Sequence, residues 1–195
     1  MPEPWMLRET FRRARRMLDR AGLRYALAGR VALAVYAEPE FTVDVDFLAA
    51  LDELSSASLI VEAEKEGFRP EPSGPGHWHY RLRHERWGTF FDVFRPPEFV
   101  LTEEVFSRSR LVRLGSGWGT CPVVSPEDLV ILFVVAGREE RGDVQKAVKV
   151  CASRLAVGDF DEGYYLRRLR EHRPRYLAVG LEVLRAAKRI TGERR

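Results

Sequence analysis

Side-chain amides are almost absent from this chain, which has no asparagine and a single glutamine, Gln145. Lysine is also scarce, so arginine carries most of the positive charge. Depletion of thermolabile amides together with many ion-pairing residues is typical of proteins from thermophiles. A GC-rich genome produces some of the same bias, so the composition leaves both explanations open.

The chain also lacks a long apolar run. No stretch approaches the roughly 20 apolar residues that a membrane-spanning helix needs, and residues 1–20 carry charges throughout. We therefore expect no secretory segment, no membrane partner and a cytoplasmic location. The two cysteines, Cys121 and Cys151, lack the spacing of a metal site, and in a reducing compartment we expect them to be buried or inert.

Two carboxylates stand one residue apart in the strand-like run over residues 41–48. Alternation along a strand places Asp44 and Asp46 on one face. Hard oxygen ligands in such a pair suit Mg²⁺, which proteins hold with one or two carboxylates plus substrate phosphates. An acidic pair at a strand end is more often a solvated edge or turn, so the pair alone does not decide between the two interpretations.

Two further features favour the metal site. An apolar run over residues 23–28 ends at Gly29, and the small residues 30–37 predict a helix whose first N–H groups would bind an anion. Farther along, Asp92 stands alone in the aromatic strand pattern of residues 88–94. A buried lone carboxylate is costly unless it is paired or ligates a cation.

The Gly29 turn, the run Thr42-x-Asp44-x-Asp46 and Asp92 together resemble the nucleotidyltransferase superfamily that includes DNA polymerase β. The closest likeness is to its small prokaryotic branch. Residues 124–143 are similar to the region that follows the catalytic domain in nucleotidyltransferases of the abortive-infection and toxin-antitoxin type. The resemblance covers about residues 20–150.

The resemblance implies an α/β protein of the α+β type with the nucleotidyltransferase fold, a mixed β-sheet flanked by helices and followed by a C-terminal helical bundle. Residues 1–124 would form the catalytic-type domain with its N-terminal helix, and the helical region over residues 125–195 would pack on it.

The resemblance also implies transfer of a nucleoside monophosphate from an NTP to a hydroxyl group of RNA, a protein or a small molecule. Two Mg²⁺ ions would assist. The residues that it assigns as catalytic and metal-binding are Asp44, Asp46 and Asp92, and those that it assigns to the nucleotide are Gly29, Arg30 and Thr42.

Arg30 departs from the family pattern, which has a second glycine or a serine at this position. Basic residues of the family are missing at two other places. This chain has Glu40 and Phe41 shortly before the Thr-x-Asp-x-Asp run, and Phe133 farther on. Arg30 would either clamp the triphosphate or neutralise the acidic pair. In the second case the chain would be a catalytically degenerate protein that binds a partner, as an RNA-binding unit or with an antitoxin-like protein.

The remaining patterns predict the surroundings of the site. Residues 4–21 predict an amphipathic helix whose arginines could contact RNA phosphates, although a charged outer face is the commoner explanation. Residues 70–76 predict a loop and residues 98–108 a helix. A hairpin over residues 77–94 would place His77 and His79 at the mouth of the cleft rather than in a zinc site.

Overall fold

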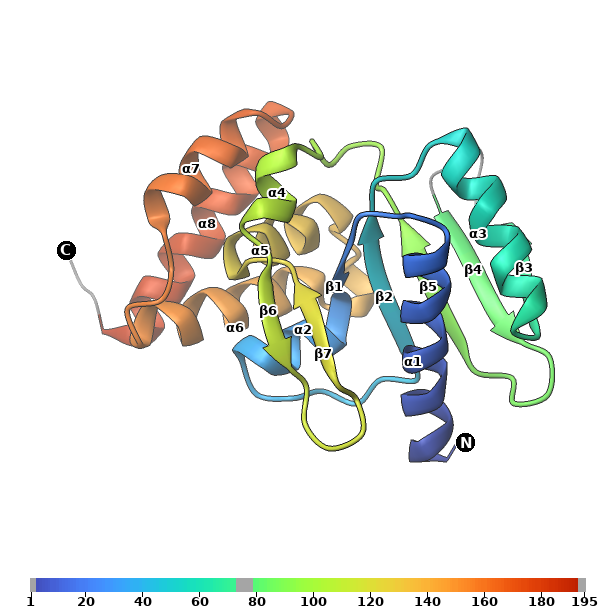
Figure 1. Ribbon diagram of the computed structural model, residues 1–195. Coiled ribbons are helices and arrows are strands. Elements are labelled where there is room, and N and C mark those ends of the chain that lie inside the picture. The colour runs from blue at the N-terminus through green and yellow to red at the C-terminus, as the bar shows by residue number, and fades with distance from the viewer. Residues whose placement is uncertain (1–2, 73–78, 193–195) are drawn as a thin grey trace.

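The computed structural model describes residues 3–72 and 79–192, and the centre of this part is a mixed sheet in the order β3-β4-β5-β2-β1-β7-β6 (Figure 1). Strand β2 pairs antiparallel with β1 and parallel with β5. The strands are β1 (Tyr25–Ala28), β2 (Asp44–Ala49), β3 (Phe68–Pro72), β4 (His79–His84), β5 (Phe90–Phe94), β6 (Arg110–Arg113) and β7 (Thr120–Val123). The expected mixed sheet is confirmed.

Helices flank this sheet. Helices α1 and α3 pack together, and α1 lies over β2 and β5, whereas α5 to α8 gather at the other end of the molecule (Figure 1). The helices are α1 (Pro4–Arg20), α2 (Gly29–Tyr36), α3 (Glu53–Lys65), α4 (Glu103–Ser107), α5 (Pro126–Ala136), α6 (Asp143–Ala156), α7 (Glu162–Arg170) and α8 (Pro174–Thr191), with a 3₁₀ turn, η1 (Glu139–Arg141). No described helix is long and apolar enough to cross a membrane.

Helix α1 is amphipathic, as its sequence predicts. Phe11, Ala14 and Leu18 recur at helical spacing and are fully buried. The Phe11 ring stacks on that of Phe47 from β2, with 5.9 Å between ring centroids. Helix α1 therefore covers the face of β2 that carries the apolar side chains.

Alternation along β2 leaves the opposite face to its acidic residues. Val45 and Phe47 are fully buried, whereas Asp44 and Asp46 are only partly buried. Helix α2 contacts β1, β2, α5 and α6, so it lies between the sheet and the C-terminal helices. The acidic face of β2 therefore points to the side of the sheet where these helices meet it.

The expected loop over residues 70–76 is wrong at its beginning, because residues 70–72 belong to β3. Strand β3 is the outermost strand of the sheet beside β4. Prolines are tolerated on an edge strand, where a missing N–H need not break the ladder. Residues 73–78, which include His77, lie outside the described residues.

The helix expected over residues 98–108 is shorter, because α4 begins only at Glu103. The side chains of Arg168 and His172 bind the backbone that precedes α4. The Val100 N–H donates to Nε2 of His172 across 3.1 Å, and the Val100 carbonyl accepts from Arg168 across 2.6 Å. These bonds use backbone groups that a longer helix would have paired within itself.

The division of the chain into two regions at residue 124 stays a prediction.

Candidate active site

Three carboxylates from two neighbouring strands converge beside the C-terminal helices. Asp46 of β2 lies directly opposite Asp92 of the parallel strand β5, and Asp44 precedes Asp46 by two residues on the same face. One ligand oxygen of each residue can be chosen so that all three lie within 4.8 Å of one another. The register of β2 and β5 thus brings together the three aspartates that the sequence singled out.

Gly29 lies against Asp46 and cannot be replaced by a larger residue without a shift. Ala28, the last residue of β1, pairs with Asp46, so α2 begins beside this carboxylate. The φ angle of Gly29 is +60°, and a Cβ atom there would lie 1.9 Å from Oδ2 of Asp46. Both the backbone conformation and the close approach therefore require glycine.

The Asp46 carboxyl lies beside two other carboxylates and has no direct donor in the described part of the chain. No described group donates a hydrogen bond to it. Burial, together with the charges of Asp44 and Asp92, raises its pKa to about 7, although Arg138 and Arg30 oppose the shift. A cation among the three carboxylates would relieve this repulsion.

Asp92 is held by basic residues of β4. Nε and Nη2 of Arg81 donate to its two oxygens across 3.0 and 2.8 Å, and the Arg81 guanidinium also lies over the Phe90 ring at 4.3 Å. Nε2 of His79 lies 3.2 Å from Oδ1 of Asp92. Burial of Asp92 favours the neutral acid, but His79 and Arg81 outweigh it, and the pKa of Asp92 is lowered. Asp92 is therefore an ionised carboxylate that already has a bidentate partner.

The two residues expected to bind nucleotide beside Gly29 both contact Asp44. The Thr42 hydroxyl donates to a carboxylate oxygen of Asp44. Nη1 of Arg30 lies 3.8 Å from Oδ1 of Asp44, which is an ion pair without a hydrogen bond. Arg30 thus forms its ion pair at the Asp44 end of the acidic cluster.

A cavity of about 480 Å³ opens beside Asp46 and Asp92. One wall is apolar and comes from α5, including Leu132 and Phe133. The rest of the lining is rich in cations, and its described arginines are Arg81, Arg95, Arg138 and Arg141. The cavity thus offers an apolar wall and positive charge next to the acidic cluster. Arg30 is not among the described residues that line it.

Arg81 and Arg138 were missed in the sequence. A signal for Arg81 was present in the sequence, because the expected hairpin turn determines which residues of its two strands pair. In the structure the N–H of His84 donates to the carbonyl of Thr89 across this turn. Moving away from the turn along both strands by equal steps places Arg81 opposite Asp92, which is the observed register. Arg138 gave no such signal, because its position depends on how α5 packs on the sheet. His79, expected at the mouth of the cleft, does line the cavity.

No protein-family model and no curated protein matches this chain. Solved structures do match. A candidate nucleotidyltransferase from H. pylori is 14% identical and has a TM-score of 0.52, with 99% of this chain and 97% of that one covered.

Two antibiotic-modifying proteins are also similar. The antibiotic-resistance factor ANT(2'')-Ia is 11% identical, with a TM-score of 0.50 and coverage of 98% of this chain and 87% of that one. The lincosamide antibiotic adenylyltransferase LnuA is 14% identical, with a TM-score of 0.50 and coverage of 73% and 96%. Such likeness at low identity concerns architecture, and it agrees with the sheet and the helices described above. This chain therefore has the nucleotidyltransferase fold.

Proposed function

We propose that this protein is a Mg²⁺-dependent nucleotidyltransferase that moves a nucleoside monophosphate from an NTP to a hydroxyl group of RNA, a protein or a small molecule. The observation that carries the proposal is the convergence of Asp44, Asp46 and Asp92 beside a cavity with an apolar wall and several arginines. The fold shared with the adenylyltransferase LnuA supports the same assignment.

The acidic cluster fits a divalent cation. Its donors are carboxylate oxygens, which Mg²⁺ prefers, and Asp46 has no hydrogen-bond donor among the described residues. Bound Mg²⁺ would polarise the phosphate that reacts and stabilise the attacking oxygen. Asp44 and Asp46 would hold the ions, and Asp92 would share its oxygens between a metal and Arg81.

The cavity suits the rest of an NTP. The first N–H groups of α2 after Gly29 would face the phosphates, since the N-terminus of a helix favours an anion. Arg138 and Arg141 of the cavity would add positive charge, and Leu132 and Phe133 would contact the base. The residues of this chain would thus position the triphosphate and offset its charge, which is the main contribution of a protein to phosphoryl-type transfer.

A second candidate function is supported by Arg81. Its guanidinium occupies both oxygens of Asp92, as expected of a degenerate member that binds a partner instead of an NTP. The contact of Arg30 with Asp44 points the same way. The two candidates differ in whether a divalent cation binds between Asp44 and Asp46.

Iron-directed cleavage separates the two candidates without requiring an acceptor. Fe²⁺ substitutes for Mg²⁺ at oxygen-ligand sites, and with ascorbate and peroxide it cuts the backbone beside the ion. The enzyme proposal predicts cuts near Asp44 to Asp46 and near Asp92, and it predicts that excess Mg²⁺ suppresses them.

The control is a variant carrying Asp44→Asn and Asp46→Asn, in which both cuts should disappear. A second control, Asp52→Asn and Asp161→Asn, removes two carboxylates that act as helix N-caps elsewhere and should leave the cuts intact. Cleavage scattered over the surface, or cleavage that is equal in both variants, would favour the partner-binding candidate.

A further inference from the structure

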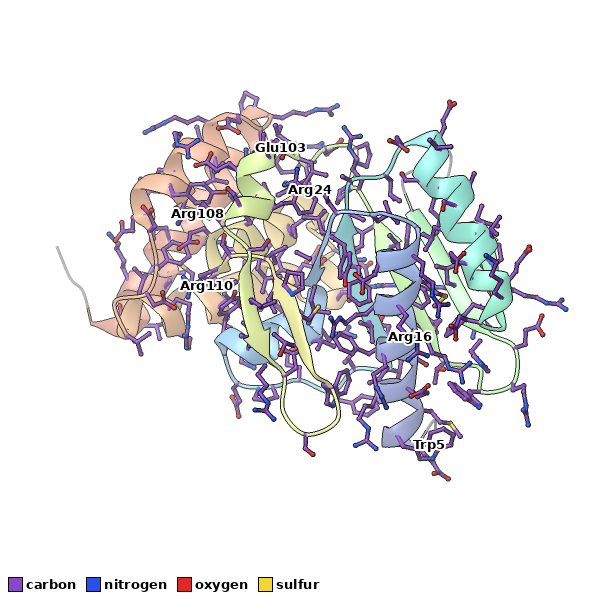
Figure 2. All side chains as sticks on the ribbon, in the orientation of Figure 1. Trp5, Arg16, Arg24, Glu103, Arg108 and Arg110 are labelled. Carbon is purple, nitrogen blue, oxygen red and sulfur yellow. The ribbon has the colours of Figure 1, made fainter. Side chains whose placement is uncertain are left out.

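A second cleft lies between α1 and the turn that joins β6 to β7. Figure 1 shows this turn near α1, and Figure 2 labels Arg16, which lies one turn before the C-terminal end of that helix. The cleft has a volume of about 520 Å³ and is separate in its lining residues from the cavity beside Asp46. The residues that line it are Arg12, Arg15, Arg16, Asp19 and Arg113, followed by the turn over residues 115–119.

Positive charge in this cleft is only partly neutralised. Arg15 and Arg113, and also Arg8 at its rim, form no ion pair with the residues that the structure describes. Arg12 and Arg16 share Glu9 with Arg13, at distances of 3.6 and 3.9 Å. Arg16 also lies 3.6 Å from Glu66, which pairs with Arg13 and Arg20 as well. Asp19 lines the cleft and accepts a hydrogen bond from Tyr25, but it forms no ion pair with a described residue. These carboxylates are fewer than the guanidinium groups around them, so the cleft keeps an excess of positive charge.

The two arginines at the ends of β6 differ in whether a carboxylate neutralises them. Arg110, labelled in Figure 2, donates two hydrogen bonds to Asp159 across 2.7 and 2.8 Å. Arg113, at the other end of the same strand, is exposed and has no such partner in the part of the chain that the structure describes. The unpaired charge is therefore a feature of the cleft and not of the whole strand.

The turn adds backbone donors and packs against α1. The φ angle of Gly117 is +82°, and a Cβ atom on it would lie 2.9 Å from Cδ of Arg8. The Trp118 ring packs on Phe11 with 5.0 Å between centroids. The N–H groups of Ser116 and Gly117 donate to no described group, so both remain available to an anion.

We propose that this cleft binds the phosphate backbone of a single-stranded nucleic acid. Guanidinium groups pair with phosphate oxygens in bidentate geometry, and the backbone N–H groups of the turn supply further donors. Trp118, partly exposed beside the arginines, offers a ring face to a base, which is how single strands are held without sequence preference. The inference does not depend on nucleotidyl transfer, because none of its residues belongs to the acidic cluster.

The test is fluorescence anisotropy of a labelled single-stranded RNA 12-mer titrated with the full chain, without NTP or metal. The variant pair Arg8→Gln and Arg113→Gln should weaken binding about tenfold. Because two phosphate contacts are lost, it should also lower the slope of log affinity against log salt by about 1.4. Neither residue forms an ion pair within the described chain, so the variant should keep the melting temperature of the wild type.

The matched control is Arg170→Gln with Arg189→Gln, which removes two exposed arginines outside the cleft and changes the net charge equally. It should weaken binding far less. Equal weakening by both pairs, or no RNA binding by the wild type, would overturn the proposal. Polyglutamate or inorganic pyrophosphate that competes as well as unlabelled RNA at equal charge would overturn it too, because the cleft would then be a site for any anion.

Discussion

Arg81 offsets part of the negative charge of the acidic cluster when no metal is bound. We predict that Arg81→Ala lowers the free energy of unfolding by about 2 kcal/mol without metal, because Asp92 loses its bidentate partner beside two other carboxylates and keeps only His79. Mg²⁺ should restore more stability to this variant than to the wild type. Urea unfolding with and without 10 mM MgCl₂, about the millimolar level at which weak carboxylate sites fill, measures both effects.

Arg83→Ala is the control for this variant. Arg83 lies on the same face of β4, but it pairs with the half-buried Glu71 instead of the cluster. Its loss should cost much less, and Mg²⁺ should not change that cost. If Mg²⁺ stabilised both variants and the wild type equally, Arg81 would not compete with a metal for Asp92.

His172 should make the protein sensitive to mild acid. Its Nε2 accepts from the Val100 N–H, so Nδ1 carries the proton and donates to the Arg168 carbonyl across 2.8 Å. Burial lowers the pKa of His172 below its usual value of 6.5. The neutral ring therefore contributes stability that is complete above pH 6.5 and is lost as the pH falls through the lower pKa of the folded state.

The measurement is the free energy of unfolding at pH 7.5 and 5.5 for the wild type and His172→Gln. We expect a smaller decrease at low pH in the variant. Burial also lowers the pKa of His84, whose contribution stays in both proteins and serves as an internal reference. An unchanged decrease would show that His172 does not resist protonation.

Single residues of the site were predictable where a local pattern determined them. Asp44 and Asp46 follow from strand alternation, and Gly29 from the end of an apolar run. The partner of Asp92 follows only from the hairpin register, and the place of Arg30 follows from no local pattern. Its guanidinium lies 3.8 Å from Asp44 because of the path of the chain between α2 and β2. The catalytic and nucleotide-binding roles that the sequence analysis assigned to the site residues stay predictions.

Helices α5 and α7 are joined by a buried polar network. Arg168 of α7 is fully buried, with Nε 3.6 Å from Oδ1 of Asp128, and Tyr164 donates to the other oxygen of Asp128 across 2.8 Å. Breaking such a network leaves a buried charge unpaired. Because Arg168 also donates to the Val100 carbonyl, the network connects both helices to the segment before α4.

We predict that Arg168→Met lowers the free energy of unfolding by about 3 to 5 kcal/mol. The neighbouring Arg167→Met is the control, because Arg167 pairs with the exposed side chains of Glu104 and Glu171 and its loss should be far less costly. Chemical denaturation of both variants compares them directly. Similar losses in the two variants would mean that the buried network does not hold the C-terminal helices.

Elements with a strong period were predicted well, and elements governed by distant contacts were not. The amphipathic period of α1 and the alternation of β2 identify both segments from local sequence. Strand β3 contains two prolines and reads as a loop, yet pairing with β4 makes it an edge strand. Helix α4 starts late because side chains from the region of α7 bind the backbone before it.

The architecture as a whole places an apolar helix, several arginines and the carboxylates of Asp46 and Asp92 around one cavity. The sheet supplies the acidic residues, α2 begins beside them, and α5 closes the other side. The mixed sheet flanked by helices could be expected from the family resemblance, whereas the seven strands of the described chain and their order are findings of the structure. The juxtaposition of α5 with the acidic face could not be read from local sequence, because it depends on packing between segments that are far apart in the chain.

The most direct test of the metal and nucleotide site is the melting temperature with Mg²⁺ and each of the four NTPs in turn. A ligand that binds only the folded state at about 100 times its Kd adds about 2.7 kcal/mol to stability. We predict a clear rise for the wild type with at least one NTP. Asp44→Asn with Asp46→Asn should show none, although it should melt higher than the wild type without ligand because the repulsion is gone. No rise for the wild type with any NTP at millimolar concentration, or an equal rise for the variant, would contradict the proposed site.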